Sequence, residues 1–306
     1  MVKTLSLIYR DQFRKLLDTA MFNKILVLGA TGNVGYPLAQ MLKNRNADFC
    51  IGIKPESELP ESMKDIESVH VDYDDISTVQ AALTNVENLF ILIPDSPLMV
   101  DQMANINTAI LDSSVARYVY ISGAGVKIAP DTWLSQNLLR CEELLRSNDL
   151  PGTILRPTFF MQNFLNHYPP SDNQMHLPVG NGIVNYIDVN DVASAACEIL
   201  IKDSIQKGVE VFHLTGKESF DMYEIAMLFS KKLKKHYEYI PISLEESKQV
   251  MTRNNLPDWL INMLQQIYKK VSENLYAFYS QDLQFLTGKE PRNFSMFIEK
   301  NRFSFE

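Results

Sequence analysis

One short stretch near the start of the chain constrains its fold more than any other. Residues Ile25 to Leu28 form an unbroken apolar run, which is typical of a buried parallel strand. Three glycines follow at three-residue spacing, Gly29, Gly32 and Gly35, and apolar residues then recur at helical spacing. In the order strand, glycine turn, helix, such a triplet indicates a dinucleotide-binding fold rather than an ordinary glycine-rich turn.

The three glycines are expected to have different tasks. Gly29 allows a tight turn, Gly32 lets the backbone approach a pyrophosphate, and Gly35 lets the helix pack against the sheet. The free N–H groups of the first helical turn would then face the phosphates. The residues predicted to bind the dinucleotide at this turn are Gly29, Ala30, Thr31, Gly32, Asn33, Val34 and Gly35.

Strands and helices alternate over the first half of the chain. The expected strands are Ile25 to Leu28, Phe49 to Ile53, Val69 to Tyr73, Leu89 to Ile93, Arg117 to Ile121 and Gly152 to Leu155. The expected helices between them include Ile76 to Leu83, Leu98 to Val115 and Thr132 to Arg146. This alternation predicts an α/β fold with a doubly wound parallel sheet. The remainder is mostly helical, with short strands expected at Val184 to Ile187, Val211 to Leu214 and Tyr237 to Ile240.

The same pattern predicts the domain organisation. Residues 21–155 would form a dinucleotide-binding Rossmann domain, and residues 156–306 a smaller, mostly helical substrate-side region. Within that region, residues 183–213 are expected to return to the first domain. Residues 1–20 precede the first strand. They are expected either to dock loosely as an extension or to lie upstream of the true start of the protein, which would then be Met21.

Composition excludes several classes of partner. The formal net charge of -8 and the pI of about 5.3 argue against nucleic acid or an anionic membrane surface. The three cysteines, Cys50, Cys141 and Cys197, are scattered, and no CxxC or His/Cys cluster occurs, so no disulfide framework and no metal site are predicted. No apolar run reaches transmembrane length. A cytoplasmic location is therefore expected.

The residues at the carboxyl ends of the strands should complete the cofactor site. An acidic residue after the second strand favours NAD(H) and a basic one favours NADP(H). Lys54 stands there and favours NADP(H), while NAD(H) remains possible if Lys54 is only a solvated loop residue. Asp72 and Tyr73 are expected beside the adenine. The full set predicted at the strand ends is Lys54, Asp72, Tyr73, Ile93, Pro94, Ser122, Pro157 and Phe160.

An aromatic and methionine-rich segment follows Arg156. Such a segment suits a flat apolar ligand, although simple core packing explains any one of its side chains equally well. Phe160 and Phe164 are the residues predicted to contact a small apolar or aromatic substrate.

The chain resembles the NmrA-like branch of the atypical short-chain dehydrogenase/reductase superfamily from Met21 onward. The motifs that carry the resemblance are Gly29 to Gly35, Val71 to Tyr73, Ile154 to Asn163, Tyr186 to Ala193 and Leu286 to Phe294. The resemblance implies a Rossmann fold and NAD(P) binding. Members of the family include NAD(P)H-dependent reductases of quinones and phenylpropanoid-like compounds, and also proteins that bind NADP(H) without turnover and act as redox sensors.

The chain departs from the superfamily at its proton-transfer residues. The family's reductases commonly place a lysine on the helix after the fifth strand, and classical relatives carry Tyr-x-x-x-Lys there, where the tyrosine protonates the reduced oxygen. These positions fall at Leu134 and Leu138, which cannot transfer a proton. Ser122 stands where the superfamily has its serine and is the one weak catalytic candidate, although a hydroxyl that caps a strand end is the slightly better interpretation.

Two functions remain open. The preferred one is an NADPH-dependent reductase of a quinone or another apolar carbonyl compound, because hydride transfer needs only a positioned nicotinamide and an acceptor. The alternative is a non-catalytic NADP(H)-sensing protein that acts through a protein partner. An epimerase or dehydratase of nucleotide sugars is disfavoured by the absence of Tyr-x-x-x-Lys.

Overall fold

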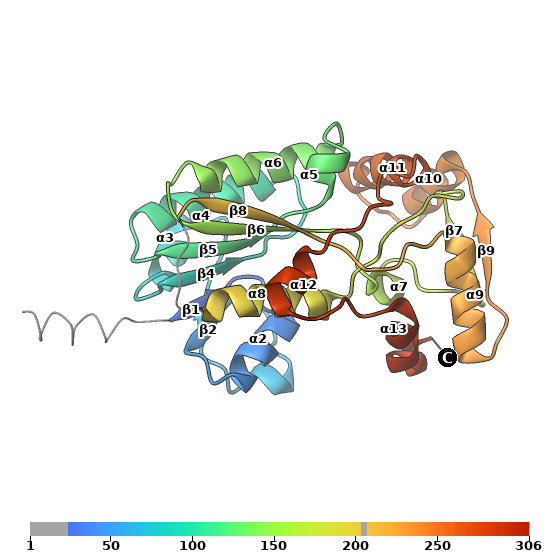
Figure 1. Cartoon of the computed structure of the whole chain (residues 1–306). Helices are drawn as coiled ribbons and strands as arrows, with labels where there is room; N and C mark the ends of the chain where they lie inside the picture. Colours follow the sequence, from blue (N-terminus) through green and yellow to red (C-terminus); the bar gives the residue numbers. More distant parts are fainter. Residues whose placement is uncertain (1–23, 203–206, 306) are drawn as a thin grey trace, which may run out of the picture.

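A computed structural model describes residues 24–202 and 207–305 (Figure 1). Seven parallel strands form one sheet in the order β3-β2-β1-β4-β5-β6-β8. The strands are β1 (Ile25–Val27), β2 (Phe49–Ile53), β3 (Ser68–His70), β4 (Asn88–Ile91), β5 (Arg117–Ile121), β6 (Gly152–Pro157) and β8 (Val209–Leu214). The predicted doubly wound sheet is confirmed. Its strand order reverses between β1 and β4, the switch point at which such sheets bind ligands.

Helices cover both faces of the sheet and bury a separate apolar core on each (Figure 1). One face carries α2 (Gly35–Asn44), α8 (Val189–Ile201) and α12 (Asp282–Thr287). The other carries α3 (Ile76–Ala82), α4 (Met99–Leu111) and α6 (Trp133–Arg146). Every residue of β1 and β4 is buried, which explains why these strands are nearly continuous apolar runs in the sequence.

The substrate-side region lies beyond the carboxyl ends of the strands (Figure 1). It has its own core of aromatic rings, including Phe164, Tyr186, Phe229 and Phe294. Its elements are α7 (Asn163–Asn166), β7 (Gln174–Leu177), α9 (Met222–Leu233), β9 (Glu238–Pro241), α10 (Leu244–Arg253), α11 (Asp258–Ser272) and α13 (Phe294–Lys300). β7 and β9 pair in parallel as a second, two-stranded sheet. The short elements η1 (Glu61–Met63), α5 (Gly125–Ile128) and η2 (Arg302–Ser304) complete the described chain.

Two later segments of the chain return to the large sheet. β8 pairs with β6 along its whole length, from Gly152↔Val209 to Pro157↔Leu214. α12 then packs on α8 and β8, and Asp282 accepts a 2.7 Å hydrogen bond from the backbone N–H of His213. The domain boundary predicted at residue 155 falls inside β6. Residues on both sides of this boundary therefore belong to the same large sheet.

Several predicted elements differ from the observed ones. The third strand ends at His70, so Val71 to Tyr73 lie outside it. The strand predicted at Val184 to Ile187 is wrong: Val184 bridges Phe220 and Ile187 bridges Phe160, each as an isolated pair. The elements α5, α7, α12, α13 and β7 were not predicted, because four to seven residues are too few to show a clear periodicity.

The predicted extension at residues 1–20 lies outside the described residues. Within residues 24–202 and 207–305, no helix combines the length and apolar character needed to cross a lipid bilayer.

Candidate functional site

The glycine turn between β1 and α2 is built so tightly that side chains are excluded. Gly29 has φ +75°, and a Cβ there would lie 2.5 Å from the carbonyl oxygen of Leu92. A Cβ on Gly35 would lie 2.1 Å from the carbonyl oxygen of Gly29. A Cβ on Gly32 would meet that same oxygen at 3.3 Å, so this position is crowded only on its inner side. The backbone at Gly32 therefore stays open to a close ligand.

Among the described residues no side chain caps the start of α2, and the N–H of Tyr36 in its first turn donates a 3.0 Å hydrogen bond to the carbonyl of Gly32. The first turn of this helix holds no acidic residue. Thr31 and Asn33 are exposed, whereas Ala30 and Val34 are buried and can offer only their backbone. An uncapped helix start, with the positive end of the helix dipole, is suited to an anion such as a pyrophosphate. The turn therefore fits a dinucleotide.

The ends of β2 and β3 place the next predicted residues. Lys54 follows β2 directly and is exposed. Asp72 is half-buried and accepts a 3.0 Å hydrogen bond from the N–H of Asp74. Tyr73 is buried in the core, its hydroxyl meets the backbone of Gly29, and burial raises its pKa. Tyr73 thus supports the glycine turn from within the core, and its position beside an adenine stays a prediction.

The residues predicted near the nicotinamide are partly enclosed. Ile93 is buried and Pro94 is exposed beyond the end of β4. Pro157 is buried within β6, and its carbonyl accepts a 2.9 Å hydrogen bond from the N–H of Ala124. Phe160 is half-buried and its backbone bridges Ile187. Phe160 thus keeps some open surface at the carboxyl ends of the strands.

Phe164 has no surface for a ligand. Its side chain is 0% exposed, and its ring lies 4.8 to 5.9 Å from the rings of Tyr168, Tyr186, Phe229 and Phe294. The prediction that Phe164 contacts substrate was wrong, because core packing accounts for all of its neighbours.

A buried carboxylate joins Ser122 to Arg156. The Ser122 hydroxyl donates a 2.7 Å hydrogen bond to Oε1 of Glu142, which is 0% exposed. The guanidinium of Arg156 donates to both oxygens of Glu142, at 2.8 and 2.5 Å. The hydroxyl hydrogen of Ser122 is therefore committed to Glu142. This arrangement favours a structural role for Ser122 over proton transfer to a substrate.

The leucines that replace the superfamily's Tyr and Lys lie beside the same strand end. A Cβ built on Gly123 would lie 3.0 Å from Cδ1 of Leu138, so the Leu138 side chain covers the backbone directly after Ser122. Leu134 is half-buried and packs against the same core. Apolar side chains thus occupy the two positions that are predicted to align with the superfamily's Tyr and Lys.

Sequence reasoning missed Glu142 and the pairing role of Arg156. Glu142 follows Cys141 on the buried face of α6, and Arg156 lies near the end of a buried strand. Two opposite charges at positions patterned as buried are the signal that could have revealed the pair, because a buried charge requires a partner.

Asp95 adds a titratable group at the end of β4. Burial raises the pKa of the Asp95 carboxyl to about 6, although the residue as a whole keeps exposed surface. Since its unfolded pKa is about 3.9, folding favours the protonated form, and stability should fall as pH rises from about 4 to about 6. We expect Asp95→Asn to flatten that decline in urea unfolding experiments across these pH values.

An exposed aspartate on α4 provides the control for this experiment. Asp101→Asn should leave the decline between pH 4 and pH 6 as it is in the parent chain. A decline of equal size in the Asp95→Asn variant would show that Asp95 is not its source.

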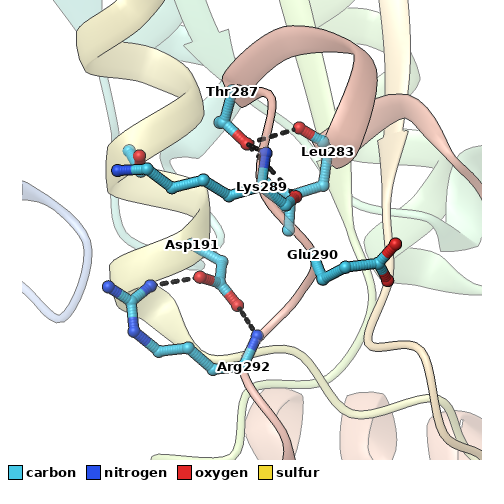
Figure 2. Close-up of a pocket in the computed structure, with 7 residues that line it drawn as sticks. Asp191, Leu283, Thr287, Lys289, Glu290 and Arg292 are labelled. Carbon is cyan, nitrogen blue, oxygen red and sulfur yellow. Dashed lines mark hydrogen bonds and ion pairs between the residues drawn. The ribbon is translucent and has the colours of Figure 1, made fainter.

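Three of the motifs that carry the family resemblance are linked to one another. Gln162 donates a 3.0 Å hydrogen bond to Asp188 and accepts one from the N–H of Val189 at the start of α8. Asp191 on the first turn of α8 binds the guanidinium of Arg292 and accepts a 2.7 Å hydrogen bond from the Arg292 backbone N–H (Figure 2). These motif residues therefore fix α8 and the C-terminal segment in place.

A hollow of about 180 Å³ lies beside the Asp191–Arg292 pair (Figure 2). It is lined by Asp191, Ser194, Leu283, Thr287, Lys289, Glu290 and Arg292. None of these residues belongs to the glycine turn or to a strand end, so this hollow is not part of the predicted cofactor site. In the described part of the chain, no group of three or more His, Cys, Asp or Glu side chains is arranged to hold a metal ion.

Comparisons with known proteins agree with the fold. The model of the NmrA-like family matches residues 21–297. The NAD(P)H azoreductase of Xenophilus azovorans is 26% identical over 290 residues, which cover 92% of this chain and 99% of that protein. The NADPH-dependent quinone oxidoreductase of Escherichia coli, solved with NADPH, superposes with a TM-score of 0.79 at 21% identity, covering 90% of this chain and 99% of its own. NmrA, a negative transcriptional regulator, superposes with a TM-score of 0.74 at 14% identity, covering 90% and 94%.

Proposed function

The chain belongs to the NmrA-like family, and from this premise we propose that it binds NADP(H) and reduces a quinone or a similar conjugated acceptor. The observation that carries the proposal is the turn from Gly29 to Gly35, where backbone geometry excludes side chains and α2 begins uncapped. A dinucleotide pyrophosphate is the ligand that such a turn accommodates at the switch point of a doubly wound sheet.

Each part of the site has a task in this proposal. The backbone of the glycine turn binds the pyrophosphate, and Lys54 binds the 2′-phosphate that distinguishes NADP(H) from NAD(H). Ile93, Pro94 and Phe160 border the path toward the ends of β5 and β6. When bound, the reduced nicotinamide supplies a hydride.

The acceptor class follows from the groups that the site lacks. Leu134 and Leu138 provide no proton, and the Ser122 hydroxyl is bound to Glu142. A carbonyl that becomes an alcohol benefits from a positioned proton donor. The oxygens of a reduced quinone can take their protons from water. The relatives named for azo and quinone substrates also reduce extended conjugated systems, which supports this choice.

A second function is supported by the same missing proton donors. The fold is shared with a transcriptional regulator, so NADP(H) binding without turnover, coupled to a protein contact, is the alternative. Turnover separates the two functions.

The experiment that tests the proposal is a titration of the purified chain with NADPH and NADH, followed by a panel of quinones while the absorbance of the reduced cofactor is recorded. Binding of NADPH with quinone-dependent oxidation is the expected result. Binding without oxidation would replace the reductase by the sensor, and binding of neither nucleotide would overturn both functions.

Lys54→Ala tests the cofactor preference. The variant should bind NADPH about tenfold more weakly and NADH unchanged, because one contact between an ammonium and a phosphate contributes about 1.5–3 kcal/mol. The measurement is the ratio of the two dissociation constants. Lys64→Ala, which removes another exposed lysine from the segment between β2 and β3, is the control and should leave that ratio unchanged. An unaltered ratio in the Lys54 variant would remove Lys54 from the site.

A further inference from the structure

A second hollow, of about 500 Å³, lies between the first turn of α6 and the helix α11. It is lined by Trp133, Trp259, Asn262, Met263, Gln265 and Gln266. These residues come from segments more than a hundred positions apart, and none belongs to the motifs of the family resemblance. The two helices lie along the same side of the molecule (Figure 1).

Two polar contacts hold the walls of this hollow together. Oε1 of Gln266 accepts a 2.7 Å hydrogen bond from the backbone N–H of Trp133. This N–H lies in the first turn of α6, where backbone N–H groups have no partner within the helix itself. Lys270 on α11 forms a 2.7 Å ion pair with Asp131, two residues before Trp133. The tryptophan rings themselves lie 5.9 Å apart at 43°. The hollow is therefore formed before any ligand arrives.

The hollow lies at the end of the sheet where ligands are expected. α6 connects the parallel strands β5 and β6, so it must run back across the sheet and begin at the carboxyl ends of the strands. That is the end at which the glycine turn and Ser122 lie. Trp133 directly precedes Leu134, the position at which the superfamily carries its tyrosine.

The chemistry of the lining indicates a flat and weakly polar ligand. Two indoles and a methionine provide polarisable apolar surface. The remaining three residues are carboxamides, and no charged side chain lines the hollow. Among the described residues, the buried amide nitrogen of Gln265 has no hydrogen-bond partner. A buried donor of this kind requires an acceptor, and a carbonyl oxygen on the ligand would supply one if the Gln265 side chain turns toward the hollow.

We propose that this hollow binds the planar conjugated acceptor of the reductase against Trp133 and Trp259, and that the Gln265 amide turns toward the hollow to donate to one of the acceptor's oxygens. This inference rests on the proposed function, because it assigns the substrate pocket of that activity. It moves the pocket from Phe164 to the junction of α6 and α11, and it favours a quinone over a charged sugar nucleotide.

The sequence itself provides the probe. The chain contains two tryptophans, and both line the hollow, so intrinsic tryptophan fluorescence reports on this site. We would titrate the full chain, saturated with NADP⁺ so that no turnover occurs, with 2-methyl-1,4-naphthoquinone. Free tryptophan amide in the same cuvette conditions corrects for absorption by the quinone. Saturable quenching is expected.

Two variants and a control make the result specific. Gln265→Leu should weaken the apparent affinity for the quinone about tenfold, as expected for a lost hydrogen bond in a buried site. Gln249→Leu removes an exposed amide on α10, outside the hollow, and should change nothing. Trp259→Ala should weaken binding as well, with Trp133 as the remaining reporter. Circular dichroism and NADPH binding confirm that each variant is folded.

The outcomes separate this inference from the proposed function. Quenching that does not saturate overturns the pocket. Quenching that is the same in the parent chain and in the Gln265→Leu variant overturns it as well. NADPH oxidation with an unchanged KM for the quinone in both variants also overturns it and leaves the reductase standing. Saturable, Gln265-dependent quenching without any NADPH oxidation supports the pocket and rejects the reductase.

Discussion

Replacing Glu142 by alanine is expected to lower the free energy of unfolding by about 3–5 kcal/mol, the usual effect of removing one partner of a buried ion pair. Glu142 is 0% exposed, and it binds both the Arg156 guanidinium and the Ser122 hydroxyl. Without the carboxylate, a charge and a hydroxyl remain in the protein interior with no counterpart. Glu142 thus ties the end of β5 to β6 by side chains, in addition to the backbone hydrogen bonds between the two strands.

Glu143, the next residue on α6, provides a matched control for Glu142. Glu143 is exposed, so Glu143→Ala should change stability by much less than its neighbour does. Urea unfolding of the two variants beside the parent chain measures the difference. A loss of the same size in both would mean that helix propensity, and not the ion pair, determines the result. Glu142→Gln keeps the shape and removes the charge, so it should fall between the parent and the alanine variant.

Replacing Gly32 by alanine is expected to weaken NADPH binding at least about tenfold, because each backbone hydrogen bond to a charged phosphate contributes about 1.5–3 kcal/mol. A Cβ at this position meets the carbonyl oxygen of Gly29 at 3.3 Å and Cδ2 of Leu92 at 3.9 Å, so the fold should be little affected. Gly35→Ala differs. Its Cβ would lie 2.1 Å from that oxygen and 2.8 Å from Cα of Ala30, so stability should fall by about 1–3 kcal/mol or more and binding should be lost with it.

Isothermal titration with NADPH and urea unfolding of both variants provide the test. Gly180→Ala is the control, because a Cβ there meets nothing within 4 Å and the turn lies outside the glycine motif. It has a positive φ, so it costs some stability but should leave NADPH binding intact. A Gly32 variant that binds NADPH as the parent does would exclude a close approach of the pyrophosphate at this residue.

Local patterns in the sequence were sufficient to predict the large sheet. A buried parallel strand has to be apolar along its length, and the turn after β1 has to be glycine where its own backbone crowds it. These requirements lie within a few adjacent residues, so they can be recognised without a structure. The Ser122–Glu142–Arg156 group could not be predicted in this way, because its three members come from a strand end, a helix and another strand.

The substrate side was harder to predict for a different reason. A ligand pocket and a protein core both require apolar and aromatic side chains. From the sequence alone, Phe160 and Phe164 were therefore equally good candidates for contact with a substrate. Only the structure separates them, since Phe164 is enclosed by four other rings while Phe160 keeps open surface. Trp133 and Trp259 are far apart in the sequence, and only the packing of α11 on α6 brings them together.

The late position of β8 and α12 in the chain affects synthesis on the ribosome. β6 remains an unpaired edge until residues 209–214 have emerged, and α12 cannot cover α8 and β8 until residues 282–287 follow. An open strand edge and an uncovered apolar face are both prone to aggregation. The nascent chain therefore carries an open edge of the sheet until residue 214 has emerged, and an uncovered apolar face until residue 287 follows.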